Sequence, residues 1–198
     1  MEQKTTNKLN IKSKIFTIPN IMSMFRIVLL PFIVLIYCVD KNYVLAGAML
    51  VFSGFTDIVD GYIARHFNMT SDLGKMLDPI ADKLTQAVML ICLWTRFPLM
   101  ACPFILMALK ESFMLISGYL LIKKVGVVPY AIWHGKAATA LLYSMVIIHI
   151  FWSEIPEYIS SIAILACSGM IAISLVLYLI KNDQILSRSK SAKNIKER

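Results

Sequence analysis

Of the five aspartates between residues 55 and 84, four stand where the hydropathy pattern favours an apolar residue: Asp57, Asp60, Asp78 and Asp82. A carboxylate within a membrane span costs about 2.5–3.5 kcal/mol on insertion scales, and such residues usually serve a function. Four of them in one short window are therefore not an accident of composition. We interpret the segment from residue 55 to residue 84 as the part of the chain that carries out chemistry.

The spacing of these acids predicts that they gather on two helix faces. The first face repeats at i, i+3, i+4 and i+7 and comprises Asp57, Asp60, Gly61 and Ala64. The second repeats at i, i+4 and i+8 and comprises Gly74, Asp78 and Asp82. The glycines and the alanine leave space on the same faces. A turn over residues 66–73 would let two antiparallel helices bring the acidic faces together.

Clustered carboxylates repel one another unless cations lie among them. Oxygen-only ligands favour hard divalent ions, Mg²⁺ or Mn²⁺ first and Ca²⁺ as a possible occupant. Neither face carries Cys or His, which argues against zinc. Four acids can hold two metal ions, and a two-metal site clamps the attacking and leaving oxygens of a phosphoryl transfer. Arg65 follows Asp60 by about one turn and is suited to binding a phosphate.

The elements that must position these residues are membrane-spanning helices. Hydrophobic residues make up 58% of the chain and charged residues 16%, against about 45–50% and about 25% in soluble domains. The apolar runs are near 20 residues long, which matches a hydrocarbon layer of about 30 Å. Because lipid offers the backbone no hydrogen-bond partner, the spans must be helical. We predict an all-α integral membrane protein with six spans, at 18–39, 43–65, 74–96, 98–122, 130–152 and 156–180.

The basic residues predict the orientation of these spans. The net charge is +8, and half of the twenty Lys and Arg residues lie in 1–14 and 181–198. Because basic flanks stay on the cytosolic side, both termini are expected in the cytosol of a plasma-membrane protein, with the acids of the second and third spans on that side. The predicted organisation is a basic juxtamembrane segment (1–17), a six-helix catalytic domain (18–182) and a basic disordered tail (183–198). Nucleic acid is not an expected partner, since no aromatic or Gly-rich interleaving accompanies the basic residues.

Residues 57–82 resemble the signature of the CDP-alcohol phosphotransferases: D-x-x-D-G-x-x-A-R, eight residues, then G-x-x-x-D-x-x-x-D. Every fixed position of that signature is present in this sequence. The segment Ile18-Pro19-Asn20 and Arg26 are similar to the first span of the bacterial phosphatidylglycerophosphate synthases in this family. Gly135-Lys136 with Thr139 resembles the G-K-x-x-T element of their fifth span.

The resemblance implies an enzyme that binds CDP-diacylglycerol, lets an alcohol attack its β-phosphorus, and releases CMP. It implies Asp57, Asp60 and Asp78 as the principal ligands of two Mg²⁺ or Mn²⁺ ions. Asp82 would complete the metal site and act as general base on the acceptor hydroxyl. The CDP-lipid pocket would be formed by Gly61, Ala64, Arg65 and Gly74. A homodimer in the lipid bilayer is also implied.

The expected acceptor is sn-glycerol 3-phosphate, with Lys110, Lys136 and Arg26 as candidate ligands for its phosphate. One departure bears on this choice, because Leu109-Lys110-Glu111 stands where the branch usually has Ala-Arg-Glu. Lysine keeps the charge but lacks the bidentate fork. Phosphatidylglycerol, which would make a cardiolipin synthase, or a neutral alcohol therefore stays open as acceptor. The alternative for Lys110 is an ion pair with Glu111 or with another helix, and for Lys136 a position at the membrane interface. Arg26 faces a similar choice.

Two other classes of protein fit the sequence less well. An ion or proton transporter also uses acids within spans, but here all four lie in one window at one side and form no relay across the bilayer. Aspartate-rich prenyltransferases have a different acid spacing in two separated motifs. Outside the motif, His66 and His134 are expected to be solvated near the cytosolic face, and His149 to pack between helices.

Overall fold

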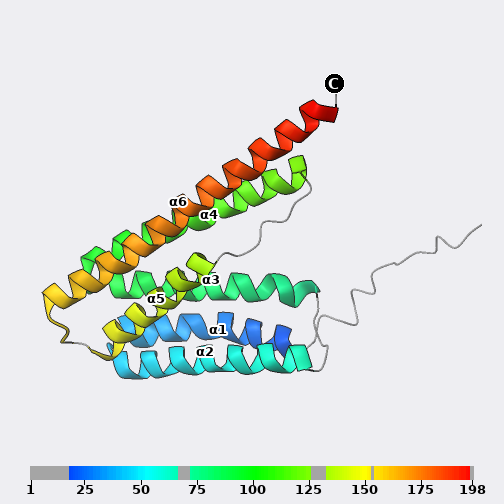
Figure 1. Ribbon diagram of the computed structural model, residues 1–198. Coiled ribbons are helices and arrows are strands. Elements are labelled where there is room, and N and C mark those ends of the chain that lie inside the picture. The colour runs from blue at the N-terminus through cyan, green and yellow to red at the C-terminus, as the bar shows by residue number, and fades with distance from the viewer. Residues whose placement is uncertain (1–17, 67–71, 126–132, 153, 197–198) are drawn as a thin grey trace, which may run out of the picture. The chain divides into compact units, whose positions relative to one another are not determined.

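Within the residues that the computed structural model describes, which are 18–66, 72–125, 133–152 and 154–196, the chain forms six long α-helices and no strand (Figure 1). The helices are α1 (Ile18–Cys38), α2 (Tyr43–His66), α3 (Asp72–Trp94), α4 (Ala101–Val125), α5 (Trp133–Phe151) and α6 (Glu157–Lys196), and the short 3-10 helix η2 (Pro98–Met100) leads into α4. Side chains at 18, 19, 57, 58, 60–66, 72–76, 124, 125 and 186–196 lie outside this description. The helical structure predicted for the six segments is confirmed within the described residues.

Four of the described segments are long and apolar enough to cross a membrane: Asn20–Cys38, Pro98–Lys123, Trp133–Phe151 and Glu157–Ile185. In α2 the described apolar stretch is shorter, Tyr43–Thr56. The second half of α2 and the first half of α3 are the segments that hold the acids of the motif, and those acids lower the hydropathy of both helices. The chain is a helical membrane protein with four candidate spans by this criterion, against the six that were predicted.

The chain divides into two compact units, Met1–Val88 and Met89–Arg198, so the division falls within α3. In the first unit α1 packs along α2 (Figure 1). The buried side chains of α1 recur every three or four residues: Asn20, Ser23, Arg26, Leu30, Ile33 and Tyr37. Ala46 and Leu50 are buried on α2, and the ring of Tyr37 meets Tyr43 edge-on at 5.0 Å. The core of this unit is therefore apolar near the α1–α2 turn and polar toward the start of α1.

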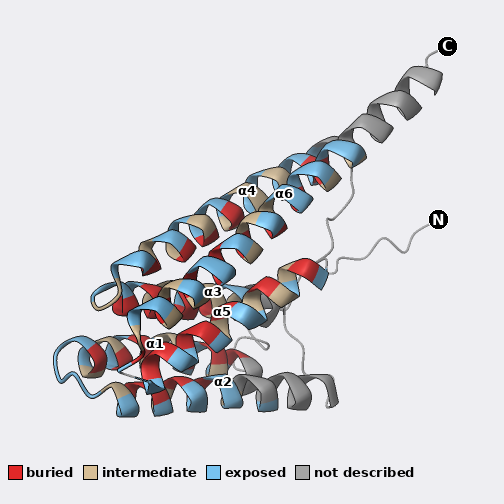
Figure 2. Cartoon of the chain, turned by 60° about the vertical axis from the view of Figure 1, so that its left-hand side comes forward, coloured by how far each residue is buried: buried red, intermediate tan, exposed pale blue. Residues whose placement is uncertain are grey.

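In the second unit α6 packs along α4 and also against α5 (Figure 1). Buried and exposed positions alternate with helical periodicity along α4 and α6, as Figure 2 shows. The buried residues of α6 include Ile164, Cys167, Ile171 and Tyr178, with three serines among them at 160, 168 and 174. Small hydroxyl residues let helices approach closely and bond to a neighbour. This unit is held by apolar packing with a few polar contacts inserted.

Helix α6 runs to Lys196, through most of the segment that was expected to be a disordered tail from residue 183. The apolar run that predicts the span ends near residue 180, but nothing in the following sequence stops a helix, since residues 181–196 contain neither Gly nor Pro. The predicted segment 1–17 lies outside the described residues.

Candidate active site

Two of the predicted metal ligands, Asp78 and Asp82, lie one turn apart on α3 and both bond to α1. The hydroxyl of Ser23 donates a hydrogen bond to the carboxylate of Asp78. The guanidinium of Arg26 donates to Asp82, with 2.5 Å between Nη1 and Oδ1. Both contacts lie within the first unit. The acidic face of α3 is thus joined to α1 by two polar contacts.

The side chains of α1 that make these contacts belong to its buried stripe. Ser23 is fully buried and Arg26 is 4% exposed, and both follow the buried Asn20 at three-residue steps. Buried polar groups persist where they have partners, and for Ser23 and Arg26 these partners include the acids of α3. Sequence reasoning singled out Arg26 but missed Ser23. The signal was available, because Asn20, Ser23 and Arg26 form a polar row in an apolar span.

The two partners of the ion pair differ in their surroundings. The side chain of Arg26 is 4% exposed, whereas that of Asp82 is 43% exposed. A hydrogen bond between two charged groups is roughly twice as strong as a neutral one, and a buried cation is screened little by salt. A covered guanidinium therefore holds a carboxylate that stays accessible to other molecules.

The remaining motif residues belong to the same helices. Asp57, Asp60, Gly61, Ala64 and Arg65 have helical backbone in α2, and Gly74 has helical backbone in α3. Their side chains lie outside the described residues. Among the side chains that are described, no three His, Cys, Asp or Glu residues come together. The donors that are described fit a hard cation, because Asp78 and Asp82 present carboxylate oxygens at i and i+4 of one helix.

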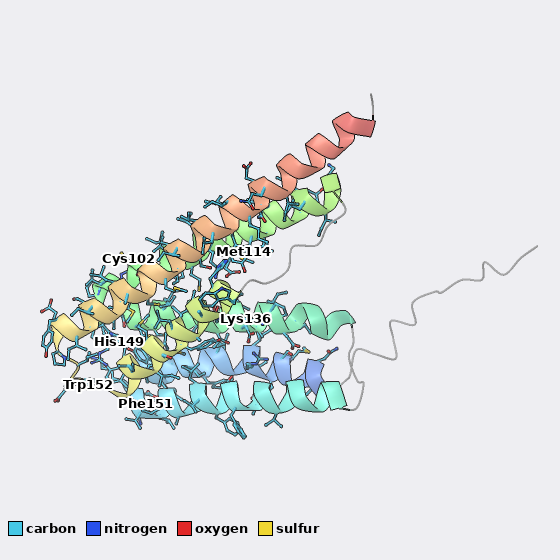
Figure 3. The ribbon with its side chains drawn as sticks, in the orientation of Figure 1. Cys102, Met114, Lys136, His149, Phe151 and Trp152 are labelled. Carbon is cyan, nitrogen blue, oxygen red and sulfur yellow. The ribbon has the colours of Figure 1, made fainter. Side chains whose placement is uncertain are left out.

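The other two predicted acceptor ligands belong to the second unit, whereas Arg26 belongs to the first. Lys110 is 5% exposed on α4, and its Nζ lies 3.3 Å from Oε1 of Glu111. The ion pair that was the alternative for Lys110 is therefore formed. Lys136 is exposed near the start of α5, where Figure 3 labels it. For Arg26 the structure shows a bond to Asp82, a role that the sequence did not predict.

A second polar cluster lies where α5 begins against α6. His134 is 6% exposed, its Nδ1 lies 3.2 Å from Oγ of Ser174, and its ring meets Tyr178 edge-on at 5.0 Å. The expectation that His134 is solvated is therefore wrong, because α6 covers it.

His149 is fully buried, and its ring nitrogens lie 2.8 Å from the carbonyl oxygen of Met145 and 2.9 Å from Oγ of Ser160. The expectation that His149 packs between helices is confirmed.

The glycine of the Gly135-Lys136 element is explained by this cluster. A Cβ at residue 135 would lie 2.8 Å from the hydroxyl oxygen of Tyr178, a buried side chain. We expect Gly135→Ala to destabilise the protein by about 1–3 kcal/mol, the usual cost of overpacking. Thermal unfolding in detergent measures this.

Gly169→Ala on α6 is the matched control, because a Cβ there meets no described atom within 4 Å. Alanine in place of an exposed helical glycine is expected to be neutral or stabilising by up to about 1 kcal/mol. Equal melting temperatures for Gly135→Ala and Gly169→Ala would contradict the packing of α5 on α6 at Tyr178.

The sequence pattern of the CDP-alcohol phosphatidyltransferase family matches residues 16–182. This match covers most of the chain and includes all of the motif residues on α2 and α3. The chain belongs to the CDP-alcohol phosphatidyltransferase family.

Individual relatives show the same kinship over shorter segments. A "Cardiolipin synthase (CMP-forming) / mitochondrial hydrolase fusion protein" of Schizosaccharomyces pombe is 41% identical over 86 residues, which are 43% of this chain and 14% of that protein. A "CDP-diacylglycerol--glycerol-3-phosphate 3-phosphatidyltransferase" of Rickettsia bellii is 38% identical over 103 residues, 51% of this chain and 56% of the relative. The Escherichia coli protein of the same name is 32% identical over 108 residues, 48% of this chain and 59% of the relative. The chain thus spans a little over half the length of these two bacterial relatives.

Proposed function

We propose that the protein transfers the phosphatidyl group of CDP-diacylglycerol to sn-glycerol 3-phosphate and releases CMP. The observation that carries this proposal is the pair Asp78 and Asp82, which α1 holds on one face of α3 within the family-matched segment. The names of the two bacterial relatives support glycerol 3-phosphate as acceptor. The name of the yeast relative supports the release of CMP.

In the proposed reaction the motif residues bind metal ions, bind the CDP-lipid and accept a proton. Asp57, Asp60, Asp78 and Asp82 would hold two Mg²⁺ or Mn²⁺ ions, which neutralise the charge of the pyrophosphate. Gly61, Ala64, Arg65 and Gly74 would bind the cytidine diphosphate part of the lipid. Asp82 accepts the proton of the acceptor hydroxyl, and the oxygen of that hydroxyl bonds to the β-phosphorus. The bond from that phosphorus to the bridging oxygen breaks, and CMP leaves with the electron pair.

Lys110 and Lys136 remain proposed ligands of the acceptor phosphate. A lysine can bind a phosphate as a point charge without the fork of an arginine. Lys136 is exposed and so can be reached by a soluble acceptor, which makes it the better placed of the two, since Lys110 is 5% exposed and paired with Glu111. Replacing either lysine by Met is expected to raise the KM for glycerol 3-phosphate, and an unchanged KM in both variants would remove them from the acceptor site.

The acceptor is decided by supplying purified enzyme with labelled CDP-diacylglycerol and one alcohol at a time. We expect CMP and phosphatidylglycerophosphate with glycerol 3-phosphate, and background CMP release with phosphatidylglycerol, inositol or no acceptor. Phosphatidylglycerol can enter only from the bilayer, so the assay needs it in the same vesicles as the enzyme. CMP release with phosphatidylglycerol and none with glycerol 3-phosphate would make the protein a cardiolipin synthase and contradict the proposed acceptor.

We further propose six spans in the plasma membrane, with both termini and the active site between α2 and α3 on the cytosolic side, and a homodimer as the assembled form. The basic residues support this orientation. A cysteine at position 154, in place of the exposed Glu154 between α5 and α6, should react with an impermeant thiol reagent only from outside. Reaction only from the cytosolic side would contradict the proposed orientation. The homodimer is tested separately, by native mass spectrometry in detergent.

A further inference from the structure

We propose that Arg26 is a positioning residue for Asp82 rather than a ligand of the acceptor, and that Ser23 positions Asp78 in the same way. This inference rests on the proposed function and adds to it a task for α1. It departs from the sequence-based prediction, which assigned Arg26 to the acceptor phosphate.

Two contacts at different positions along the helices join α1 to α3. Ser23 and Arg26 are three residues apart on α1, and their partners Asp78 and Asp82 are four residues apart on α3. At a rise of 1.5 Å per residue, the contacts are separated by about 4.5 Å along α1 and about 6 Å along α3. One contact would let α3 turn about it, but two contacts a turn apart oppose both rotation and sliding. The carboxylates of Asp78 and Asp82 are therefore held in a fixed orientation relative to α1.

Arg26 and Asp82 differ in how far they are buried. A ligand of a soluble acceptor must be reached by it, yet Arg26 is 4% exposed and its Nη1 is engaged by Asp82. Asp82 is 43% exposed, so it can meet a substrate while its Oδ1 is held. Arg26 would therefore affect the reaction by orienting the carboxylate of Asp82.

A general base must be held close to the atom that it deprotonates. Its oxygen must lie within about 2.6–3.2 Å of the atom that it deprotonates, and a misplacement of about 1 Å can cost about 10²-fold in rate. An aspartate with one oxygen bonded to a buried cation loses much of its rotational freedom. Arg26 would thus supply the orientation that Asp82 needs, and Ser23 would supply that of Asp78.

The test is steady-state kinetics of Arg26→Gln, Arg26→Lys and Ser23→Ala. We expect Arg26→Gln to lower kcat by about 10–100-fold, with KM for glycerol 3-phosphate within about threefold of wild type. Arg26→Lys, which keeps the charge, should recover part of kcat. Ser23→Ala should lower kcat less, since it removes a neutral donor. An acceptor ligand would behave differently, because its loss raises KM, so a tenfold rise in KM with unchanged kcat overturns the inference.

Two control variants come from the second unit. Arg96→Gln removes a cation that lies 5.2 Å over the ring of Phe97, and Ser168→Ala removes a buried hydroxyl. Both should leave kcat and KM at wild-type values. If Arg96→Gln lowers kcat as much as Arg26→Gln does, the effect is a general one on the fold and the inference fails.

A second measurement does not depend on activity. The melting temperatures of Arg26→Gln, Asp82→Ala and the double variant form a cycle, because alanine at position 82 removes the acceptor of the pair. If the pair exists, the double variant loses less than the sum of the two single losses, and additive losses overturn the inference. A wild-type protein that releases no CMP with any acceptor would instead overturn the proposed function and the catalytic task of Arg26, while the cycle would still decide whether the pair forms.

Discussion

Asp82→Asn is expected to abolish CMP release while the protein still binds CDP-diacylglycerol. A general base acts only on the acceptor, so its loss removes the chemical step and spares much of the lipid site. The usual contribution of such a base is about 10²–10⁴-fold in rate. Asparagine has nearly the same shape and can still accept a hydrogen bond from Arg26, so the contact with α1 is disturbed as little as possible.

Asp57→Asn and Asp78→Asn should behave differently from Asp82→Asn. These residues are proposed as metal ligands, and they should lose CDP-lipid binding together with turnover. Asp40→Asn is the control, because Asp40 is exposed in the turn between α1 and α2. If Asp82→Asn retains more than about a tenth of the wild-type rate, the base is another group.

Removal of divalent cations should have an effect as large as the loss of Asp82. We expect EDTA to reduce CMP release to background, and an excess of Mg²⁺ or Mn²⁺ to restore it. The physical reason is that the four carboxylates of the motif, together with a pyrophosphate, carry more negative charge than Arg26 and Arg65 can balance. The measurement is the rate of CMP release against free metal concentration.

A melting curve in EDTA is the control for that experiment, because loss of activity through unfolding would lead to the wrong conclusion. Ca²⁺ and Zn²⁺ should be compared at the same free concentration, since an all-oxygen donor set disfavours zinc. Full activity in chelator, with no divalent ion added, would contradict the two-metal proposal while leaving the membership of the family intact.

The positions of the helices and of the acidic motif were determined by the sequence alone. A backbone in lipid must satisfy its own hydrogen bonds, so an apolar run of sufficient length has little choice but to be a helix. Periodicity then places Asp78 and Asp82 on one face of α3, because the spacing of side chains around a helix is a local property. The bounds of α1 through α5 follow from these two local rules to within a few residues.

The partner of each charged or polar side chain was decided only by the tertiary structure. Arg26 bonds to Asp82, Ser23 bonds to Asp78, and His134 is covered by α6 rather than solvated. Such choices depend on which helices become neighbours and at what register, and residues far apart in the chain settle them. The same holds for Gly135, whose lack of a side chain is explained only by Tyr178 on α6. One-dimensional spacing shows which face a side chain occupies, but the group opposite it is supplied by another helix.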